Sequence, residues 1–109
     1  MYKNHSNENL QKVSFKNHDL ANAAFVNSDL RGTDFSGANL TGATLTSANM
    51  AGANLSGADL TGVIIMDKNW LDMLDDWGVI GAKEIQSSYK MIDESFNGEV
   101  KFHLERIKN

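Results

Sequence analysis

The chain has no cysteine and no long apolar run among its 109 residues. Without cysteine, disulfide bonds, thiolate metal ligands and thiol nucleophiles are excluded. No segment approaches the roughly 18 consecutive apolar residues of a membrane helix, and the N-terminal stretch MYKNHSNENLQKV lacks the apolar core of a secretion signal. These absences favour a cytoplasmic protein without a membrane segment, with a length that suits one small domain.

An excess of positive charge is also missing, since 10 Lys and Arg residues face 14 Asp and Glu residues and the net charge is -4. Phosphate groups are neutralised by clustered Lys and Arg side chains, which this composition does not supply in surplus. Nucleic acid is therefore an unlikely partner.

What the sequence does contain is a period of five. The stretch 36 to 60 reads SGANLTGATLTSANMAGANLSGADL, with a small residue, a polar residue and a large apolar residue recurring in the same order. Neither the 3.6-residue period of a helix nor the 2-residue period of a strand explains this spacing. Followed along the chain, the large apolar residues are Leu10, Phe15, Leu20, Phe25, Leu30, Phe35, Leu40, Leu45, Met50, Leu55, Leu60 and Ile65.

The residue two positions after each large apolar one is Asn or Gly, with a single Ser, from Asn17 to Gly62. Asn and Gly tolerate the positive φ that the third residue of a type II turn requires. A chain that turns by about a right angle at each turn completes one coil in four quintets, and coils can stack at the strand spacing of about 4.8 Å. The large residues would then fill the axis, each contributing about 1.5 to 3 kcal/mol when buried.

Stacking by 20 residues predicts four faces, each with its own inward column. We name the faces by the first member of the column. The columns are Leu10, Leu30 and Met50; Phe15, Phe35 and Leu55; Leu20, Leu40 and Leu60; and Phe25, Leu45 and Ile65.

The segments ANLTG, ANLSG and ADLTG resemble the A(D/N)LXX signature of the pentapeptide-repeat family, over residues of about 8 to 65. The resemblance implies an all-β solenoid, a right-handed quadrilateral β-helix of about three coils, formed by residues 1–65. Val13 and His18 are bulky where Ala is usual, and Ile64 stands where Asp or Asn is expected. We therefore expect the first and last coils to contact something other than a standard coil, with His18 as an inward edge histidine.

Residues 66–109 lack the period and are predicted to be a C-terminal cap with an appendage in the same compact unit. A stacked coil leaves its last apolar layer and strand edges exposed unless they are covered. A helix capped by Asn69 and ended by Gly78 would provide this cover. Its predicted cap residues, at helical spacing, are Trp70, Leu71, Leu74 and Trp77.

A second short helix is expected over Ala82 to Ser88, followed by a β-hairpin. Asn97-Gly98 is typical of a type I′ turn, and Val100, Phe102 and Leu104 alternate as in a strand. A hairpin alone is marginal, so it should pack on the helices or on another chain. The turn aligns the pairs Glu94 with Lys101, Lys90 with Glu105, and Met91 with Leu104.

No catalytic, cofactor-binding or metal-binding residues emerge from the sequence, and neither an enzyme nor a cofactor is expected. His5, His18 and His103 are far apart and show no ligand spacing. Asp75 and Asp76 are adjacent on the expected helix, where neighbours diverge around the axis and form a solvated face.

The family resemblance implies a bacterial cytoplasmic protein, a non-enzymatic scaffold or protein-protein interaction module whose partner the sequence does not identify. A homodimer could form through the C-terminal hairpin or the exposed first coil. The quinolone-resistance members of the family suggest a first alternative, a DNA mimic that modulates DNA gyrase. The charge is poorly placed for it, because residues 1–65 hold five acids and four bases (net -1) and residues 66–109 hold nine acids and six bases (net -3).

A second alternative is an ice-binding surface made of outward hydroxyl groups. Thr41 and Thr61 would stack on one face. Ala21, Arg31 and Ala51 interrupt the neighbouring outward positions, so the sequence predicts no flat array of threonines.

Overall fold

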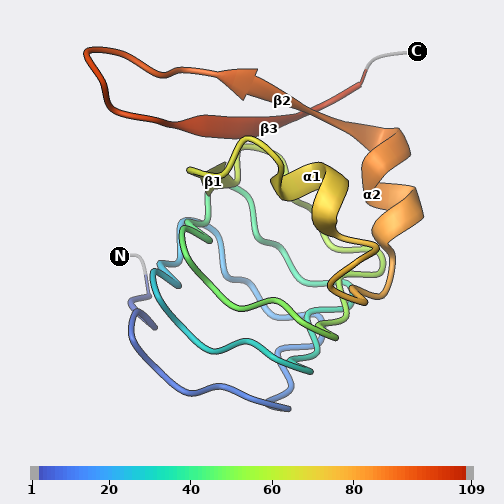
Figure 1. Ribbon diagram of the computed structural model, residues 1–109. Coiled ribbons are helices and arrows are strands. Elements are labelled where there is room, and N and C mark those ends of the chain that lie inside the picture. The colour runs from blue at the N-terminus through green and yellow to red at the C-terminus, as the bar shows by residue number, and fades with distance from the viewer. Residues whose placement is uncertain (1–2, 108–109) are drawn as a thin grey trace.

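A computed structural model describes residues 3–107 of the chain. Its helices and strands all lie after residue 63: β1 (Ile64–Ile65), α1 (Trp70–Met73), α2 (Ala82–Ser88), β2 (Tyr89–Asp93) and β3 (Phe102–Arg106). The residues before β1 form a stack of coils, with the two helices and the β2–β3 hairpin gathered at its far end (Figure 1).

The coils are stacked with a register of 20 residues. Isolated parallel bridges join residues 20 positions apart, from Asn4 with Ala24 to Thr44 with Ile64. Backbone hydrogen bonds accompany them, as where the Leu10 N–H donates to the Asp29 carbonyl at 2.8 Å. Four quintets therefore make one coil, and the pairing begins at Asn4, earlier in the chain than the residues that carry the family resemblance.

A tight turn separates successive quintets. The N–H of Val13 donates to the carbonyl of Leu10, and the same bond recurs every five residues up to Val63 and Leu60. The third residue of the turn has positive φ throughout, from Lys12 at 61° to Gly62 at 77°. The predicted turn is confirmed, because positive φ at this position is what a type II turn needs.

The inward columns are closely packed from the second coil onward. The large residues from Leu20 to Ile65 are at most 1% exposed, whereas Leu10 and Phe15 in the first coil are only partly buried. His5 extends the Phe25 column by one member, since its ring stacks on Phe25 with centroids 5.4 Å apart and an interplanar angle of 15°. The sequence pattern does not indicate this position of His5, because a histidine is not recognised as a member of an apolar column.

The expectation that His18 points inward is wrong. His18 is exposed, its Nδ1 lies 3.0 Å from the Lys16 carbonyl oxygen, and its ring meets the Phe15 ring edge-on. Val13, the other bulky residue at a small position, is 37% exposed. Among the described residues no coil precedes the first one, so bulky side chains there can turn toward solvent.

The helix after the repeat is shorter than predicted. α1 spans four residues, and the Asn69 side chain makes no capping hydrogen bond. Instead the Asp67 carboxylate accepts the Asn69 N–H at 2.8 Å. Turns continue as far as Gly78, whose φ is 69°. Next to it, the Trp77 carbonyl accepts the Gly52 N–H of the stack at 2.9 Å.

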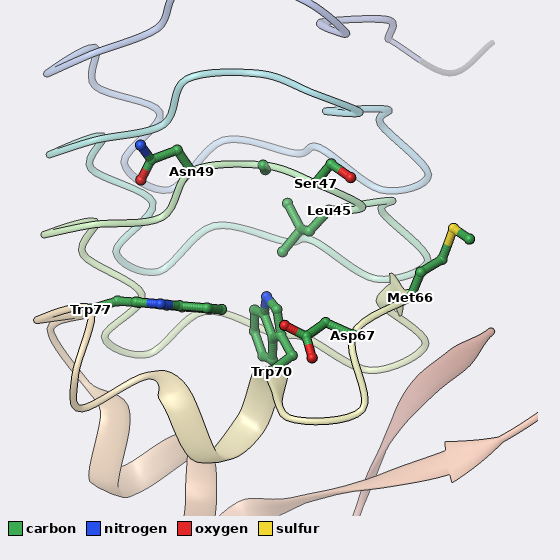
Figure 2. A pocket seen from close by; sticks show the side chains of 8 residues that line it. Leu45, Ser47, Asn49, Met66, Asp67, Trp70 and Trp77 are labelled. Atoms are coloured by element: carbon green, nitrogen blue, oxygen red, sulfur yellow. The ribbon is translucent and has the colours of Figure 1, made fainter. Parts of the chain in front are cut away.

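Residues 77–81 rejoin the stack beyond the last quintet of the Phe15 face. Ile80 pairs in parallel with Asn54, an offset of 26 residues (80 minus 54) where the repeat has 20. Leu74 (0% exposed), Trp70 (3%) and Val79 (6%) bury their side chains at this end of the core. Figure 2 shows Trp70 below Leu45 and Trp77 below Asn49. The bridge between Asn54 and Ile80 extends the stack to residues after 65.

The hairpin packs directly on the repeat. Its strands extend β1 into an antiparallel sheet of order β1-β3-β2, in which Ile64 pairs with His103. The last coil thus contacts the hairpin and not a standard coil, as expected from Ile64. The predicted pairs Lys90 with Glu105 and Met91 with Leu104 are confirmed, and positive φ at both turn residues fits the predicted type I′ turn.

Tyr89, in β2, provides a hydrogen-bond acceptor for a backbone N–H of the last coil. Its hydroxyl oxygen accepts the buried Leu60 N–H at 3.0 Å, and its side chain is 3% exposed. Because Tyr89→Phe removes the acceptor and leaves a buried donor unsatisfied, we expect a loss of about 1 to 3 kcal/mol of unfolding free energy. Urea denaturation measures the loss, and amide exchange at Leu60 should accelerate; an unchanged exchange rate at Leu60 would contradict this role.

Candidate interaction faces

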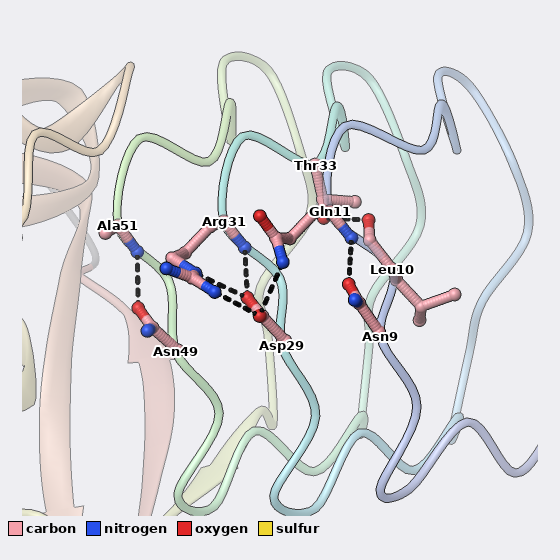
Figure 3. A network of polar contacts seen from close by, with 8 residues as sticks. All are labelled: Asn9, Leu10, Gln11, Asp29, Arg31, Thr33, Asn49 and Ala51. Carbon is pink, nitrogen blue, oxygen red and sulfur yellow. Dashed lines mark hydrogen bonds and ion pairs between the residues drawn. The ribbon is translucent and has the colours of Figure 1, made fainter.

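Three of the four faces share a ladder of side-chain acceptors. The residue before each large apolar one places its side-chain oxygen on the N–H two positions later. On the Leu10 face these bonds run from Asn9 to Gln11, Asp29 to Arg31, and Asn49 to Ala51, at 3.1 to 3.2 Å (Figure 3). This Asx turn explains the preference for Asp and Asn, because the N–H it satisfies takes no part in the ladder between coils.

The Leu10 face also carries an ion pair joined by two hydrogen bonds. Arg31 donates from Nε to Oδ1 of Asp29 at 2.9 Å and from Nη2 to Oδ2 at 2.7 Å, and the Gln11 amide donates to the same carboxylate at 2.9 Å. The hydrogen bonds from Arg31 lower the pKa of Asp29 below its usual value. The face is therefore polar and internally paired.

On the Leu20 face the threonine hydroxyls are engaged locally. Thr41 donates from Oγ1 to Asn39 at 2.7 Å, and Thr61 donates to Asp59 at 2.8 Å. On the Phe15 face Ser36 donates in the same way to Asp34 at 2.7 Å. Their outward polar groups are thus held in fixed positions by their own quintets.

The carboxylates of these turns should make the chain sensitive to acid. The pKa of Asp34 is lowered by hydrogen bonds from the Ser36 hydroxyl and N–H, and that of Asp29 by Arg31. A lowered pKa in the folded state adds stability above the unfolded-state value, near 3.8, and the stability is lost as pH falls through the folded-state pKa. We expect the melting temperature to fall below about pH 4.

The matched test replaces Asp29 and Asp34 by Asn, which keeps the turn acceptor and removes the titration. This variant should lose less stability than the parent between about pH 4 and pH 2. Asp76→Asn serves as a control, since Asp76 is exposed and its carboxylate makes no hydrogen bond or ion pair within residues 3–107. Identical acid profiles for the parent and the double variant would show that the turns do not cause the sensitivity.

The Phe25 face differs from the other three. Its first quintet still has the Asx bond, since Asn4 Oδ1 accepts the Ser6 N–H at 3.0 Å. From residue 23 onward Ala24, Thr44 and Ile64 occupy the Asx positions, and the Val26 N–H donates instead to the Ser6 hydroxyl of the previous coil at 3.2 Å. The three quintet stretches 23–26, 43–46 and 63–66 contain no charged residue. This face is the neutral one.

The neutral face continues into the hairpin. A groove of about 510 Å³ lies between them, lined on one side by the uncharged residues Thr46, Ile64 and Met66. The hairpin lines its other side with Gly98 and Val100 and with one residue of each charge, Glu99 and Lys101. Around it the chain exposes large apolar side chains, namely Phe96 (76%), Met66 (50%) and Val100 (44%). We call the Phe25 face from residue 23 onward, together with Phe96 and Val100, the neutral surface.

The histidines do not form a common site. His103 lies between two carboxylates of the hairpin, with Nδ1 2.5 Å from Glu94 and Nε2 2.9 Å from Glu105, whereas His5 contacts Glu8 at the other end of the stack. Within residues 3–107, no three His, Asp or Glu side chains are grouped closely enough to hold a metal ion. In the same residues, no helix has the length and apolar character needed to span a membrane.

The repeat defines a class of protein. The model of the family described as pentapeptide repeats matches residues 9–42 and 25–62, with eight copies. Segment 9–62 of this chain therefore belongs to the pentapeptide-repeat family. A comparison with curated proteins finds no match.

Solved structures with similar coils come from the same family, whose members are right-handed β-helix proteins. A pentapeptide repeat protein from the Arabidopsis thaliana thylakoid lumen is 39% identical over 56% of this chain and 42% of its own, with a TM-score of 0.56. The protein Rfr23 from the cyanobacterium Cyanothece 51142 is 28% identical over 66% of this chain and 42% of its own, with a TM-score of 0.52. This chain thus spans about two fifths of the length of each.

A third relative is QnrB1, a plasmid-mediated fluoroquinolone resistance protein, in a trypsin-treated form. It is 27% identical over 71% of this chain and 43% of its own, with a TM-score of 0.28. A superposition at that score supports no structural argument for a shared function.

Proposed function

We propose that this chain is a non-enzymatic protein-interaction module that binds its partner through the neutral surface. Pentapeptide-repeat proteins are generally structural or interaction modules. The observation that carries the proposal is the contrast between faces. Three present polar groups that hydrogen-bond within the quintet or to the next coil, and one presents, from residue 23 onward, uncharged side chains beside exposed Phe96 and Val100. Depletion of charge and enrichment of aromatic side chains mark the centres of protein interfaces.

The supporting frame, we infer, is a right-handed quadrilateral β-helix of about three coils, as in the solved relatives. The 20-residue register and the buried columns support this architecture. Trp70, Leu71, Leu74 and Trp77 act as its C-terminal cap, with Trp70 and Leu74 buried and Leu71 and Trp77 packed against the core. A rigid frame lowers the entropic cost of binding, because the contact side chains are already placed.

The test adds one charge to the neutral surface of the full chain. Thr46→Glu changes an outward position on the Phe25 face, and Ala51→Glu changes the same position of a quintet on the Leu10 face. In affinity capture from the native cell, a partner retained by the parent and by Ala51→Glu should be lost with Thr46→Glu. Loss with both variants, or with neither, would overturn the assignment of the surface.

The full chain is needed for this experiment. Removing residues 66–109 would uncover the last coil, because Tyr89 and Leu104 are buried and bond to Leu60 and Gly62. Circular dichroism of each variant shows whether its fold is retained.

Self-association is a separate proposal. A second copy could pair through the hairpin or against the first coil, where Leu10 and Phe15 are only partly buried. Light scattering coupled to size-exclusion chromatography measures the mass directly. A strict monomer at high concentration would remove both modes.

Neither alternative function gains a supporting observation. Modulation of gyrase by DNA mimicry needs a dense line of free negative charge, whereas Asp29 is paired with Arg31 and Asp34 and Asp59 accept bonds from their own turns. Ice binding needs outward hydroxyls, and those of Thr41 and Thr61 donate to Asn39 and Asp59. A cytoplasmic location stays a prediction.

A further inference from the structure

A second cavity lies where the chain leaves the stack and returns to it. The coil departs at Met66 and rejoins at Trp77, which leaves one corner without a next quintet. A cleft of about 330 Å³ occupies this corner, between Leu45, Ser47 and Asn49 of the last complete coil and the two tryptophans below (Figure 2).

The chemistry of the cleft is aromatic and acidic. Both tryptophans of the chain line it, and Asp67 is the single charged residue in its lining. The Trp77 ring lies flat below Asn49, with one face toward the space between them, and the Asp67 carboxylate lies beside Trp70 (Figure 2). A cation over an indole face is attracted by the negative charge of the ring face, and most strongly where water is excluded.

One group at this site lacks a partner. Trp70 is 3% exposed, yet its Nε1 has no acceptor among the described residues. Its nitrogen stands at the end of the ring that faces the coil above, near Leu45 (Figure 2). Buried indole N–H groups usually find an acceptor, so the corner is incomplete without an additional oxygen.

We propose that this cleft binds a small organic cation with a methylated ammonium head and an oxygen acceptor, of the choline type. The ammonium head lies against the Trp77 face and is paired electrostatically with Asp67. The oxygen accepts the Trp70 N–H. An anion is disfavoured because Asp67 repels it, and the net charge of -4 adds to that preference.

In calorimetric titrations of the full chain, three probes separate the contribution of the positive charge from that of the oxygen acceptor. Choline carries both the cation and the oxygen, tetramethylammonium lacks the oxygen, and 3,3-dimethylbutanol is the neutral isostere of choline. We expect choline to bind at least about tenfold more tightly than the neutral isostere and more tightly than tetramethylammonium. Intrinsic fluorescence should respond too, since both tryptophans line the cleft.

Equal affinity for choline and 3,3-dimethylbutanol, or no binding of choline at millimolar concentrations, would overturn the proposal. Equal affinity for choline and tetramethylammonium would overturn the role assigned to the Trp70 N–H.

A matched pair of variants tests the carboxylate. Asp67→Asn removes the charge but keeps an oxygen that can accept the Asn69 N–H, which Asp67 now bonds at 2.8 Å. Asp72→Asn removes an exposed charge from α1 that does not line the cleft. Choline affinity should fall about tenfold in the first variant and stay unchanged in the second; equal affinities in both would overturn the site.

Discussion

Leu40→Asp is expected to unfold the chain. Leu40 is 0% exposed and lies in the column between Leu20 (1%) and Leu60 (0%), where a carboxylate would have neither water nor a cation. Burying an unpaired charge costs several kcal/mol, which is comparable with the whole stability of a small domain, about 5 to 15 kcal/mol. Circular dichroism should show no folded baseline.

A graded variant keeps this prediction measurable. Leu40→Ala should remain folded and lose about 3 to 5 kcal/mol, the usual result of truncating a fully buried leucine. Urea denaturation of both proteins gives the difference in unfolding free energy.

The control is the preceding residue. Asn39 is exposed, and its Oδ1 accepts the Thr41 N–H at 3.0 Å and the Thr41 hydroxyl at 2.7 Å. Asn39→Ala should therefore cost only about 1 kcal/mol. Similar losses for Asn39→Ala and Leu40→Ala would contradict the assignment of outward and inward positions.

Gly81→Ala is expected to have the second largest effect. Gly81 follows Ile80, which pairs with Asn54, and so passes directly over Ser56. Its φ is 93°, and an added Cβ would lie 3.1 Å from both the backbone N and the Cα of Ser56. Since backbone atoms cannot move aside as a flexible side chain can, backbone strain and overpacking together should cost about 2 to 5 kcal/mol.

Gly78→Ala is the matched control. Gly78 also has positive φ, at 69°, but nothing lies within 4 Å of the position of its Cβ. This variant carries the left-handed backbone penalty alone, about 1 to 2 kcal/mol. If thermal unfolding shows equal losses for the two variants, the close approach of Gly81 to Ser56 does not limit stability.

The repeat was predictable because its cause is local. The Asn or Gly after each quintet sets a turn through its own φ, and the apolar residue before it points to the axis regardless of distant neighbours. At the first coil, the position in the quintet did not predict which side chains are buried. His5 stacks on Phe25 and His18 is exposed. The first described coil packs against one coil and not two, so the position in the quintet alone does not determine which side chains are buried there.

The candidate interaction surface was only half visible in advance. Once the 20-residue register is known, the amino-acid sequence alone shows that the Phe25 face carries no charge from residue 23 onward. The groove beside this face could not be predicted from the sequence, because the groove depends on the pairing of β3 with β1. In that pairing Ile65 lies opposite Phe102 and Ile64 opposite His103, residues 37 and 39 positions apart.

By itself the sequence determined the period, the turns, the inward columns and the hairpin register, since each follows from steric preferences and side-chain alternation within a few residues. Only the tertiary structure decided how the last coil is covered: the return of residues 77–81 to the stack, the Tyr89 hydroxyl over Leu60, and the corner between Trp70 and Trp77. The physical reason is that strand edges accept any backbone donor or acceptor of suitable geometry. The packing of the whole chain determines which segment pairs with the edge of the last coil.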